Sequence, residues 1–466
     1  MSILLHAYNR LLTDISQARG VLLDPPIDLT MEWVLIRGPE LDKELLHVLE
    51  TSVDMLPYWE FTQRLPDWIK PLWVEFCRCA IVGIRELKPN IKGDDQAWVF
   101  LQNVRQLLVF CYKAEFEPSE KQCEEALSQF ASTDDVCEAY NNNLRNWVAN
   151  RKLPLRLSEA RKMIGQVIHK IDWLDIEPAH GPGAVFPSCG PADKSKFNTL
   201  YRSIQDVYPY DRYLCMLPSF IEDILRLEKH GVILEKDYIE CRVQTVPKDS
   251  RGPRIICVHP KEAIWIQQGQ RRLLERAIAN SRLTRSNIVF DDQSINGSLA
   301  LAASDSGLMF TLDLKEASDR ISSELVRVLF GEYAYERMSC ARATHCSLGR
   351  GKTRLLHKWA PMGNCLTFPV QSLVFWAVIR AGIRCRHGVN CDDIYVFGDD
   401  IIAPTQYYQT VIESLVMCGL VPNMAKTFYQ GSFRESCGVD AWKGYNVTPF
   451  RMRKGSINSV SDAVSL

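Results

Sequence analysis

The triplet Gly398-Asp399-Asp400 places two neighbouring carboxylates at a position where they could bind a metal ion. It stands between two apolar runs, residues 394–397 and 401–403, and this pattern predicts a strand, a tight turn and a second strand. Two ionised carboxylates side by side repel each other, and a divalent cation is the simplest compensation. Gly and Asp are also ordinary turn residues, so the triplet alone is a weak indication.

A third carboxylate, Asp313, ends the alternating segment 310–312 and is expected at the end of a strand. Beside an Asp-Asp hairpin, it would complete a set of three carboxylates around two cations. Two cations about 4 Å apart can activate a 3′ hydroxyl and stabilise a leaving pyrophosphate. Successive strand residues face opposite ways, so we expect Asp399 to be the principal ligand and Asp400 the weaker one. The alternative for Asp313 is an acid at a strand end that faces solvent.

A basic turn supplies the complementary charge. Lys248, Arg251 and Arg254 lie between two predicted strands, residues 242–246 and 255–258. A triphosphate needs positive charge on the side away from its metal ions, and this turn could provide it. A solvated charged hairpin is the alternative interpretation.

Three further positions have residue types that suit the same chemistry. Asp319 follows Asp313 by six residues, where a helix is predicted to begin near residue 318; it either caps that helix or contacts a ribose 2′ hydroxyl. Gly363 lies in a loop before an apolar helix and can adopt backbone angles that other residues avoid. This freedom would let the loop shift beside a template base. Lys426 is a candidate proton donor to pyrophosphate, or a lysine near a helix end.

Composition limits the class of protein. A length of 466 residues predicts two or three subdomains, and a hydrophobic fraction of 46% is ordinary for a globular protein. No apolar run reaches 18 residues, and no signal peptide is evident, so the 16 cysteines are expected as thiols in a cytosol. A cluster around residues 340–346 and 385–391 matches no standard zinc spacing. A net charge of −1 argues against a uniformly basic surface, although it allows a basic channel.

The order of predicted elements indicates an α+β chain. Residues 1–175 are mostly helical in pattern, with the clearest helical spacing at 42–56, 96–113 and 158–171. A segment rich in Gly and Pro, residues 177–184, marks a boundary. From residue 308 onward, strands and helices follow one another in an order that fits an antiparallel sheet.

Six segments between residues 240 and 455 together resemble the RNA-directed RNA polymerases of single-stranded RNA bacteriophages, the leviviruses. They occur in the order in which that family has them, which makes coincidence a poor explanation. The segments are residues 245–248 with Arg254, 291–300, 313–322, 362–373, 397–402, and 433–438 with 447–450.

The resemblance implies a right-hand fold of fingers and palm. We therefore expect a helical N-terminal region at 1–175, fingers at 176–300 with the basic loop 245–254, and a palm at 301–455. The insertion 331–360 would return to the fingers, and residues 456–466 would begin a truncated or minimal thumb.

The resemblance also implies a replicase that copies the phage RNA without a primer in the cytoplasm of the bacterial host. Asp313, Asp399 and Asp400 fall on the family's ligands for two Mg²⁺ ions, with Mn²⁺ as an alternative. The expected partners are RNA template, nucleoside triphosphates, host elongation factors Tu and Ts and a ribosomal protein, without a membrane. Asn364 is expected beside the nucleotide and Thr367 in the loop on the template side.

Two residues depart from the family pattern: Cys365 stands where a glycine is usual, and Gln371 where Glu is frequent.

Two other interpretations of the function stay open. One is a replicase of the mitovirus or narnavirus type, and the other is an inactive relative that binds RNA. An inactive relative would have no reason to keep the three aspartates together with Lys248 and Lys426.

Overall fold

The computed structural model describes residues 2–26, 29–51, 56–85, 93–114, 117–214, 234–249, 252–349 and 351–453. Arg251 and the expected thumb at 456–466 lie outside these residues. The described part has the mixed helices and sheets of an α+β protein, as predicted. Within it, no helix is both long enough and apolar enough to cross a membrane.

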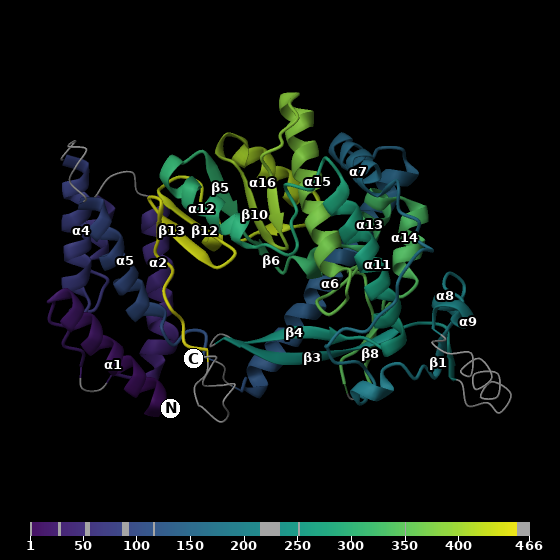
Figure 1. Cartoon of the computed structure of the whole chain (residues 1–466), viewed down its shortest axis with the longest axis horizontal. Helices are drawn as coiled ribbons and strands as arrows, with labels where there is room; N and C mark the ends of the chain where they lie inside the picture. Colours follow the sequence, from purple (N-terminus) through teal and green to yellow (C-terminus); the bar gives the residue numbers. More distant parts are fainter. Residues whose placement is uncertain are drawn as a thin grey trace.

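The N-terminal helices form one unit at one end of the molecule (Figure 1). This N-terminal unit, residues 2–114, has its buried apolar residues at helical spacing, such as Leu45 and Leu49 in α2 and Leu101 in α5. The helices predicted at 42–56 and 96–113 are present as α2 and α5, with residues 52–55 of the first prediction outside the described residues. The helices of the unit are α1 (Ser2–Arg19), α2 (Gly38–Thr51), α3 (Leu56–Phe61), α4 (Lys70–Arg85) and α5 (Gly93–Val109).

The core of the N-terminal unit is completed from the other end of the sequence. Phe433 of β12 (Phe433–Ser436), Trp442 of β13 (Val439–Trp442) and Met452 are buried in the same cluster as the N-terminal helices. Trp442 packs edge-on against Phe76, with ring centroids 5.3 Å apart. The small sheet β12-β13-β14, which ends with β14 (Tyr445–Asn446), therefore holds the N-terminal unit against the rest of the molecule.

A three-stranded antiparallel sheet lies at the centre, with the strand order β5-β10-β9. It consists of β5 (Met309–Leu312), β10 (Asp400–Pro404) and β9 (Tyr395–Phe397). The strand-turn-strand predicted around residue 398 is confirmed. The almost wholly buried helix α15 (Thr367–His387) packs behind this sheet, and α7 (Leu155–Ile168) packs against α15.

A second sheet, with the order β4-β3-β7-β8, is formed by segments far apart in the sequence. The basic hairpin consists of β3 (Glu240–Asp249) and β4 (Gly252–Val258), close to the predicted bounds. β7 (His345–Ser347) pairs with β3 in parallel, and β8 (Thr353–Leu355) follows it, so residues 345–355 return to the sheet of the hairpin. Figure 1 shows the hairpin reaching from the side of α11 toward the N-terminal unit.

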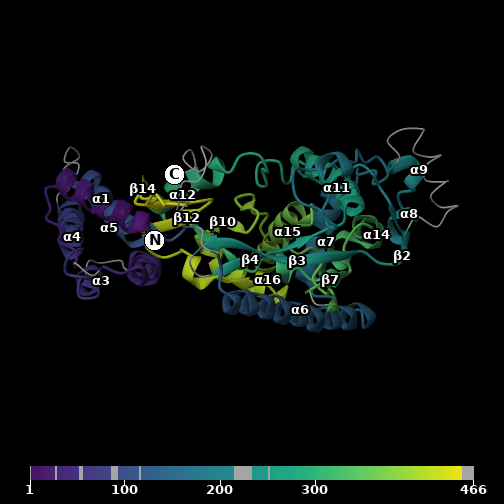
Figure 2. The ribbon, with the colours of Figure 1, turned by 90° about the horizontal axis from the view of Figure 1, so that it is seen from below.

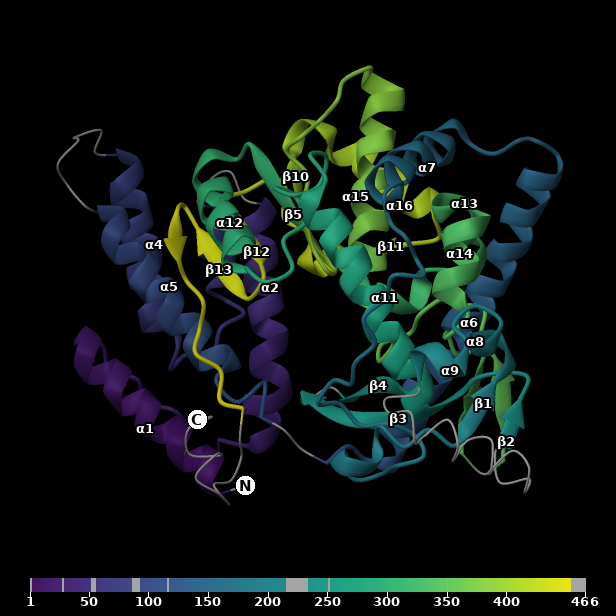
Figure 3. The same cartoon turned by 45° about the vertical axis from the view of Figure 1, so that its right-hand side comes forward.

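The 30-residue helix α6 (Glu120–Ala149) runs along one face of the molecule, as Figure 2 shows. It begins with a capping box, in which Ser119 and Gln122 each satisfy a backbone N–H of the other. Figure 3 shows α11 (Lys261–Asn280) beside α7, on the other side of the central sheet from the N-terminal unit.

The remaining elements are short or connect these units. They are β1 (Thr199–Tyr201), α8 (Arg202–Gln205), α9 (Tyr210–Tyr213), β2 (Leu234–Lys236), α12 (Ser294–Ser306), β6 (Leu314–Lys315), α13 (Ser323–Phe330), α14 (Glu332–Ser339), α16 (Tyr408–Met417) and β11 (Val421–Pro422).

Candidate active site

The turn between β9 and β10 is built so that only glycine fits its first position. Gly398 has a φ of +66°, and a Cβ added there would lie 2.6 Å from the ring of Phe368. Its backbone N–H donates to Ser372 Oγ at 3.2 Å. Phe368 and Ser372 both belong to α15, so this helix sets the position of the two aspartates that follow.

The central sheet brings Asp313 to the two turn aspartates. Ile401 pairs with Leu312 across the ladder, so Asp313 continues β5 at the level of Asp400. Partial desolvation, followed by the charge of Asp313, raises the pKa of Asp399. Burial, followed by the charges of Glu435, Asp399 and Asp313, raises the pKa of Asp400 to about 8. The three carboxylates therefore share one electrostatic environment in which negative charge is in excess.

Backbone and side-chain donors hold the carboxylates in place. Asn423 Nδ2 donates to Asp313 Oδ2 at 2.9 Å, and the backbone N–H of Cys437 donates to Asp400 Oδ2 at 3.2 Å. Lys426 Nζ lies 3.4 Å from the same oxygen of Asp313. Asp399 receives its main compensating charges from Lys426 and Arg254, and it stands at the exposed tip of the turn.

A fourth carboxylate, Glu435 of β12, belongs to the same cluster and was not predicted. Its Oε2 lies 3.8 Å from Lys426 Nζ, and its backbone N–H donates to Thr311 Oγ1 at 3.2 Å. Burial raises the pKa of Glu435, while the charges of Glu435 and Asp313 raise the pKa of Lys426. In the sequence Glu435 stands out only as part of a family segment, because its contact with Lys426 forms when β12 folds back beside the turn Met424–Lys426.

The donors in this cluster are carboxylate oxygens, the ligands that Mg²⁺ and Mn²⁺ prefer. Excess negative charge is what a divalent cation would relieve, so the residue types fit such an ion. The side chains are not preassembled around one point, since no group of three or more His, Cys, Asp or Glu residues in the described ranges is arranged to hold a metal. The cysteine and histidine cluster considered from the sequence is likewise not assembled there.

Asp319 lies in a 3-10 turn, Ser318–Arg320, and α13 begins only at Ser323, so Asp319 does not cap a helix. Its Oδ1 lies 3.4 Å from the Nζ of Lys358, a lysine with none of its side chain exposed. Burial raises the pKa of Asp319, and the charge of Lys358 acts in the opposite direction. Asp319 Oδ1 is buried without a hydrogen-bond donor among the described residues.

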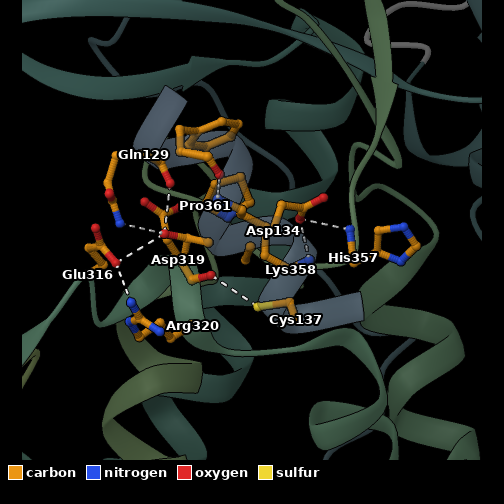
Figure 4. A network of polar contacts seen from close by, with 12 residues as sticks. Gln129, Asp134, Cys137, Glu316, Asp319, Arg320, His357, Lys358 and Pro361 are labelled. Atoms are coloured by element: carbon orange, nitrogen blue, oxygen red, sulfur yellow. Dashed lines mark hydrogen bonds and ion pairs between the residues drawn. The ribbon is translucent and has the colours of Figure 1, made fainter. Parts of the chain in front are cut away.

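Helix α6 packs against this turn and against residues 357–358 (Figure 4). Lys358 Nζ donates to Phe130 O at 3.0 Å and lies 3.5 Å from the centroid of the Phe130 ring. Asp134 Oδ1 accepts the backbone N–H groups of residues 357 and 358, each at 2.9 Å. Thr133 Oγ1 donates to Glu316 Oε2 at 3.1 Å. These contacts link α6 to the segment that follows Asp313.

The loop before α15 is fastened to the basic hairpin. Cys257 of β4 donates its backbone N–H to Met362 O at 2.8 Å, and a Cβ at Gly363 would lie 2.1 Å from Cys257 O. Gly363 has a φ of +116°, a conformation that favours glycine. Thr367 Oγ1 donates to Ala360 O at 3.0 Å. Asn364 Nδ2 is buried without a hydrogen-bond acceptor in the described ranges.

The basic hairpin contributes two of its three predicted cations to the described structure. Lys248 and Arg254 are exposed on β3 and β4. The charge of Arg254 opposes the rise in the pKa of Asp399, which places this guanidinium on the side of the carboxylates. Arg251, predicted with them, lies outside the described residues.

These features define an α+β protein with an acidic centre on an antiparallel sheet, flanked by basic residues. The chain belongs to the RNA replicase beta-chain family, whose model matches residues 230–466. It is 37% identical over 266 residues to the RNA-directed RNA polymerase beta chain of Escherichia phage MS2, covering 54% of this chain and 47% of the relative. To the beta chain of Enterobacteria phage fr it is 38% identical over 212 residues, 46% of this chain and 37% of the relative.

A third relative, the RNA-directed RNA polymerase subunit beta of Escherichia virus Qbeta, is 34% identical over 209 residues. That match covers 45% of this chain and 34% of the relative. The chain thus spans less than half the length of each of these three curated relatives.

Proposed function

We propose that this chain carries the catalytic centre of an RNA-directed RNA polymerase that replicates a phage RNA genome without a primer. The observation that carries the proposal is the register of the central sheet, which sets Asp313 at the level of Asp400 beside the turn, with Lys426 Nζ 3.4 Å from Asp313 Oδ2. Family membership supports the same reaction, because the relatives are named RNA-directed RNA polymerases.

In this proposal the central sheet and its helices, within residues 301–455, form the palm. The sheet of the basic hairpin and α11, within residues 176–300, belongs to the fingers. The pairing of β7 with β3 supports the assignment of residues 331–360 to the fingers as well. The N-terminal unit is assigned to neither, since it shares its core with β12 and β13.

We assign Asp313 and Asp399 as the main metal ligands and Asp400 as the weaker one. Asp400 already accepts the N–H of Cys437, whereas Asp399 stands at the tip of the turn. Two Mg²⁺ ions, or Mn²⁺, would supply the charge that lowers the barrier to attack by the 3′ hydroxyl. The carboxylates raise the pKa of Lys426, so any charge that neutralises them brings Lys426 closer to releasing its proton to pyrophosphate.

Recognition of ribose is assigned to Asp319 and Asn364. A 2′ hydroxyl donates one hydrogen bond and accepts others, so it needs both an acceptor and a donor. Asp319 Oδ1 is a buried acceptor with an ion pair to Lys358 and no hydrogen-bond donor in the described residues, and Asn364 Nδ2 is a buried donor without an acceptor there. Arg254 and Lys248 are assigned to the triphosphate. Thr367, which bonds the backbone of its own loop, is assigned with Gly363 to the template side.

The test is nucleotide incorporation by purified protein with a template, nucleoside triphosphates and Mg²⁺. Asp399→Asn should abolish incorporation, and the matched control Asp305→Asn, at an exposed position of α12, should leave it unchanged. Mg²⁺ should also raise the Tm of the wild type more than that of Asp399→Asn, because only the wild type gains a full set of ligands. Full incorporation by Asp399→Asn would refute the assignment.

Host factors and location are proposed on the family resemblance alone. The proposal includes host elongation factors Tu and Ts, a ribosomal protein and the bacterial cytoplasm. Affinity purification of the tagged chain from an infected host, followed by identification of the bound proteins, tests this part separately from the catalytic assignment.

A further inference from the structure

A short segment near the end of the described chain, residues 447–453, lies along α5 and is called the strap here. Backbone groups along the strap form hydrogen bonds with side chains of α5 and with the backbone of Phe110, the residue that follows α5. These bonds hold the strap against the helix along its length. The bonds are Arg105 Nη1 to Val447 O (3.2 Å), Gln102 Nε2 to Thr448 O (3.1 Å), Gln106 Nε2 to Phe450 O (2.6 Å), Phe450 N to Gln106 Oε1 (2.7 Å) and Met452 N to Phe110 O (2.8 Å).

A buried ionic network anchors the strap. Arg105 has 1% of its side chain exposed and lies between Asp42 and Asp440, with both N–O distances at 2.9 Å. Asp440 Oδ2 also accepts Arg451 Nη2 at 3.0 Å. The network joins the N-terminal unit, β13 and the strap, so the position of Arg451 is set by contacts from three parts of the chain.

The strap and the end of the N-terminal unit present three cations, Lys113, Arg451 and Arg453, called the strap cations here. Lys113 and Arg453 are exposed, and neither forms an ion pair with a described carboxylate. Arg451 pairs with Asp440, but its Nε is buried without a hydrogen-bond acceptor in the described ranges. Met452, between the two arginines, is buried in the core, so the strap is held in place while it presents positive charge.

The strap cations adjoin the candidate active site. Arg451 pairs with Asp440, which lies directly opposite Glu435 in the β12–β13 ladder, and Glu435 Oε2 lies 3.8 Å from Lys426 Nζ. Partial desolvation and then the charges of Arg451 and Arg453 lower the pKa of Lys113, while the charge of Asp440 acts in the opposite direction. Cations that repel one another beside a reaction centre are costly to hold together unless an anion binds there. In Figures 1 and 3 the strap runs between the N-terminal helices, below β12 and β13.

We propose that the strap cations bind backbone phosphates of the RNA held at the carboxylates, an inference that rests on the proposed polymerase function. RNA presents phosphates in a row, which suits three cations on two adjoining segments. A single triphosphate already has the exposed cations of the basic hairpin, Lys248 and Arg254. The strap thereby gives the N-terminal unit a direct part in holding RNA.

The test uses the full chain with Lys113→Gln and Arg453→Gln combined. Both side chains are exposed and outside ion pairs, so folding should be retained, and an unchanged Tm would verify it. Arg19→Gln with Lys152→Gln is the matched control, since it removes two exposed cations elsewhere. Affinity is measured for single-stranded RNA and for an RNA duplex with a single-stranded overhang, over a range of salt concentrations, without divalent ions or nucleotides.

We expect the double variant to bind one or both RNAs about tenfold more weakly at low salt. The magnitude of the slope of log affinity against log salt should fall by about 1–2, because two contacts with phosphates are lost. The RNA that is weakened identifies whether template or duplex occupies the site. Affinity and slope equal to the control's would overturn the proposal, and so would an effect confined to the KM for nucleoside triphosphates.

This outcome is separable from that of the catalytic assignment. Asp399→Asn should lose synthesis but keep the RNA affinity and salt slope of the wild type. A wild type without synthesis, combined with a reduced slope in the double variant, would refute the polymerase proposal while RNA binding by the strap stands.

Discussion

Gly398 shows how a single residue determines the geometry of the candidate site. Its left-handed φ and the ring of Phe368 each exclude a side chain, for different reasons. Gly388, at the end of α15, has a similar φ of +71° but nothing within 4 Å of an added Cβ. The two glycines therefore separate backbone strain from steric contact.

We expect Gly388→Ala to lower the free energy of unfolding by about 1 kcal/mol, the cost of the backbone conformation. Gly398→Ala should cost about 2–4 kcal/mol, because Phe368 must also move, and it should reduce nucleotide incorporation at least tenfold. Chemical denaturation and the incorporation assay measure both effects. Equal losses of stability in the two variants would show that the contact with Phe368 is unimportant.

His259 should make stability depend on pH. Burial, followed by the charge of Arg342, lowers the pKa of His259 to about 4, and the ring nitrogens have no hydrogen-bond partner among the described residues. A histidine with a lowered folded-state pKa contributes its full stability above the unfolded-state value of about 6.5, and this is lost as pH falls toward 4.

Between pH 7.5 and pH 5 this histidine should cost the wild type about 2 kcal/mol. His259→Leu should lose less stability over the same interval, although other groups titrate in both proteins. Denaturation curves at the two pH values give the difference. An identical pH dependence in wild type and variant would contradict the assignment of a neutral buried ring.

At the scale of elements, α6 stabilises the segment after Asp313 through Lys358 and Asp319. Lys358→Met should lower the free energy of unfolding by about 3–5 kcal/mol, because it leaves Asp319 buried without its cation. The double variant Lys358→Met with Asp319→Asn should recover much of that loss. A double-mutant cycle by chemical denaturation measures the coupling, and additive losses would argue against the pair.

Local patterns in the sequence predicted the elements that carry the aspartates. The alternation before Asp313, the apolar runs around Gly398 and the helical spacing at 158–171, where α7 lies, all depend on neighbours in the chain, and these elements are present. Glu435 and Asn423 were missed as site residues because each contacts the segment of β5 and Asp313, which lies more than a hundred residues earlier in the sequence. The support from Asp134 was missed for the same reason, since an acid within a helix looks like a solvated face.

At the scale of the whole molecule, Arg105 connects the two ends of the described chain. Arg105→Met removes the cation between Asp42 and Asp440, which leaves Asp42 buried without its cation and Asp440 with Arg451 alone. We expect a loss of about 3–5 kcal/mol and a parallel loss of RNA affinity, because the strap would no longer be held on α5. Arg64→Met, which breaks an exposed pair with Glu44, is the control and should cost less than about 1 kcal/mol.

The shared core of the N-terminal unit and β12–β13 also has a consequence for biosynthesis. Gln102 and Gln106 bond residues that lie 346 and 344 positions later in the chain. At about 5–20 residues per second, a ribosome needs roughly 20–70 seconds to make that intervening length. During this interval the helices of the N-terminal unit lack Phe433 and Trp442, the aromatic residues that complete their core. The N-terminal unit is therefore made well before it can reach its final packing.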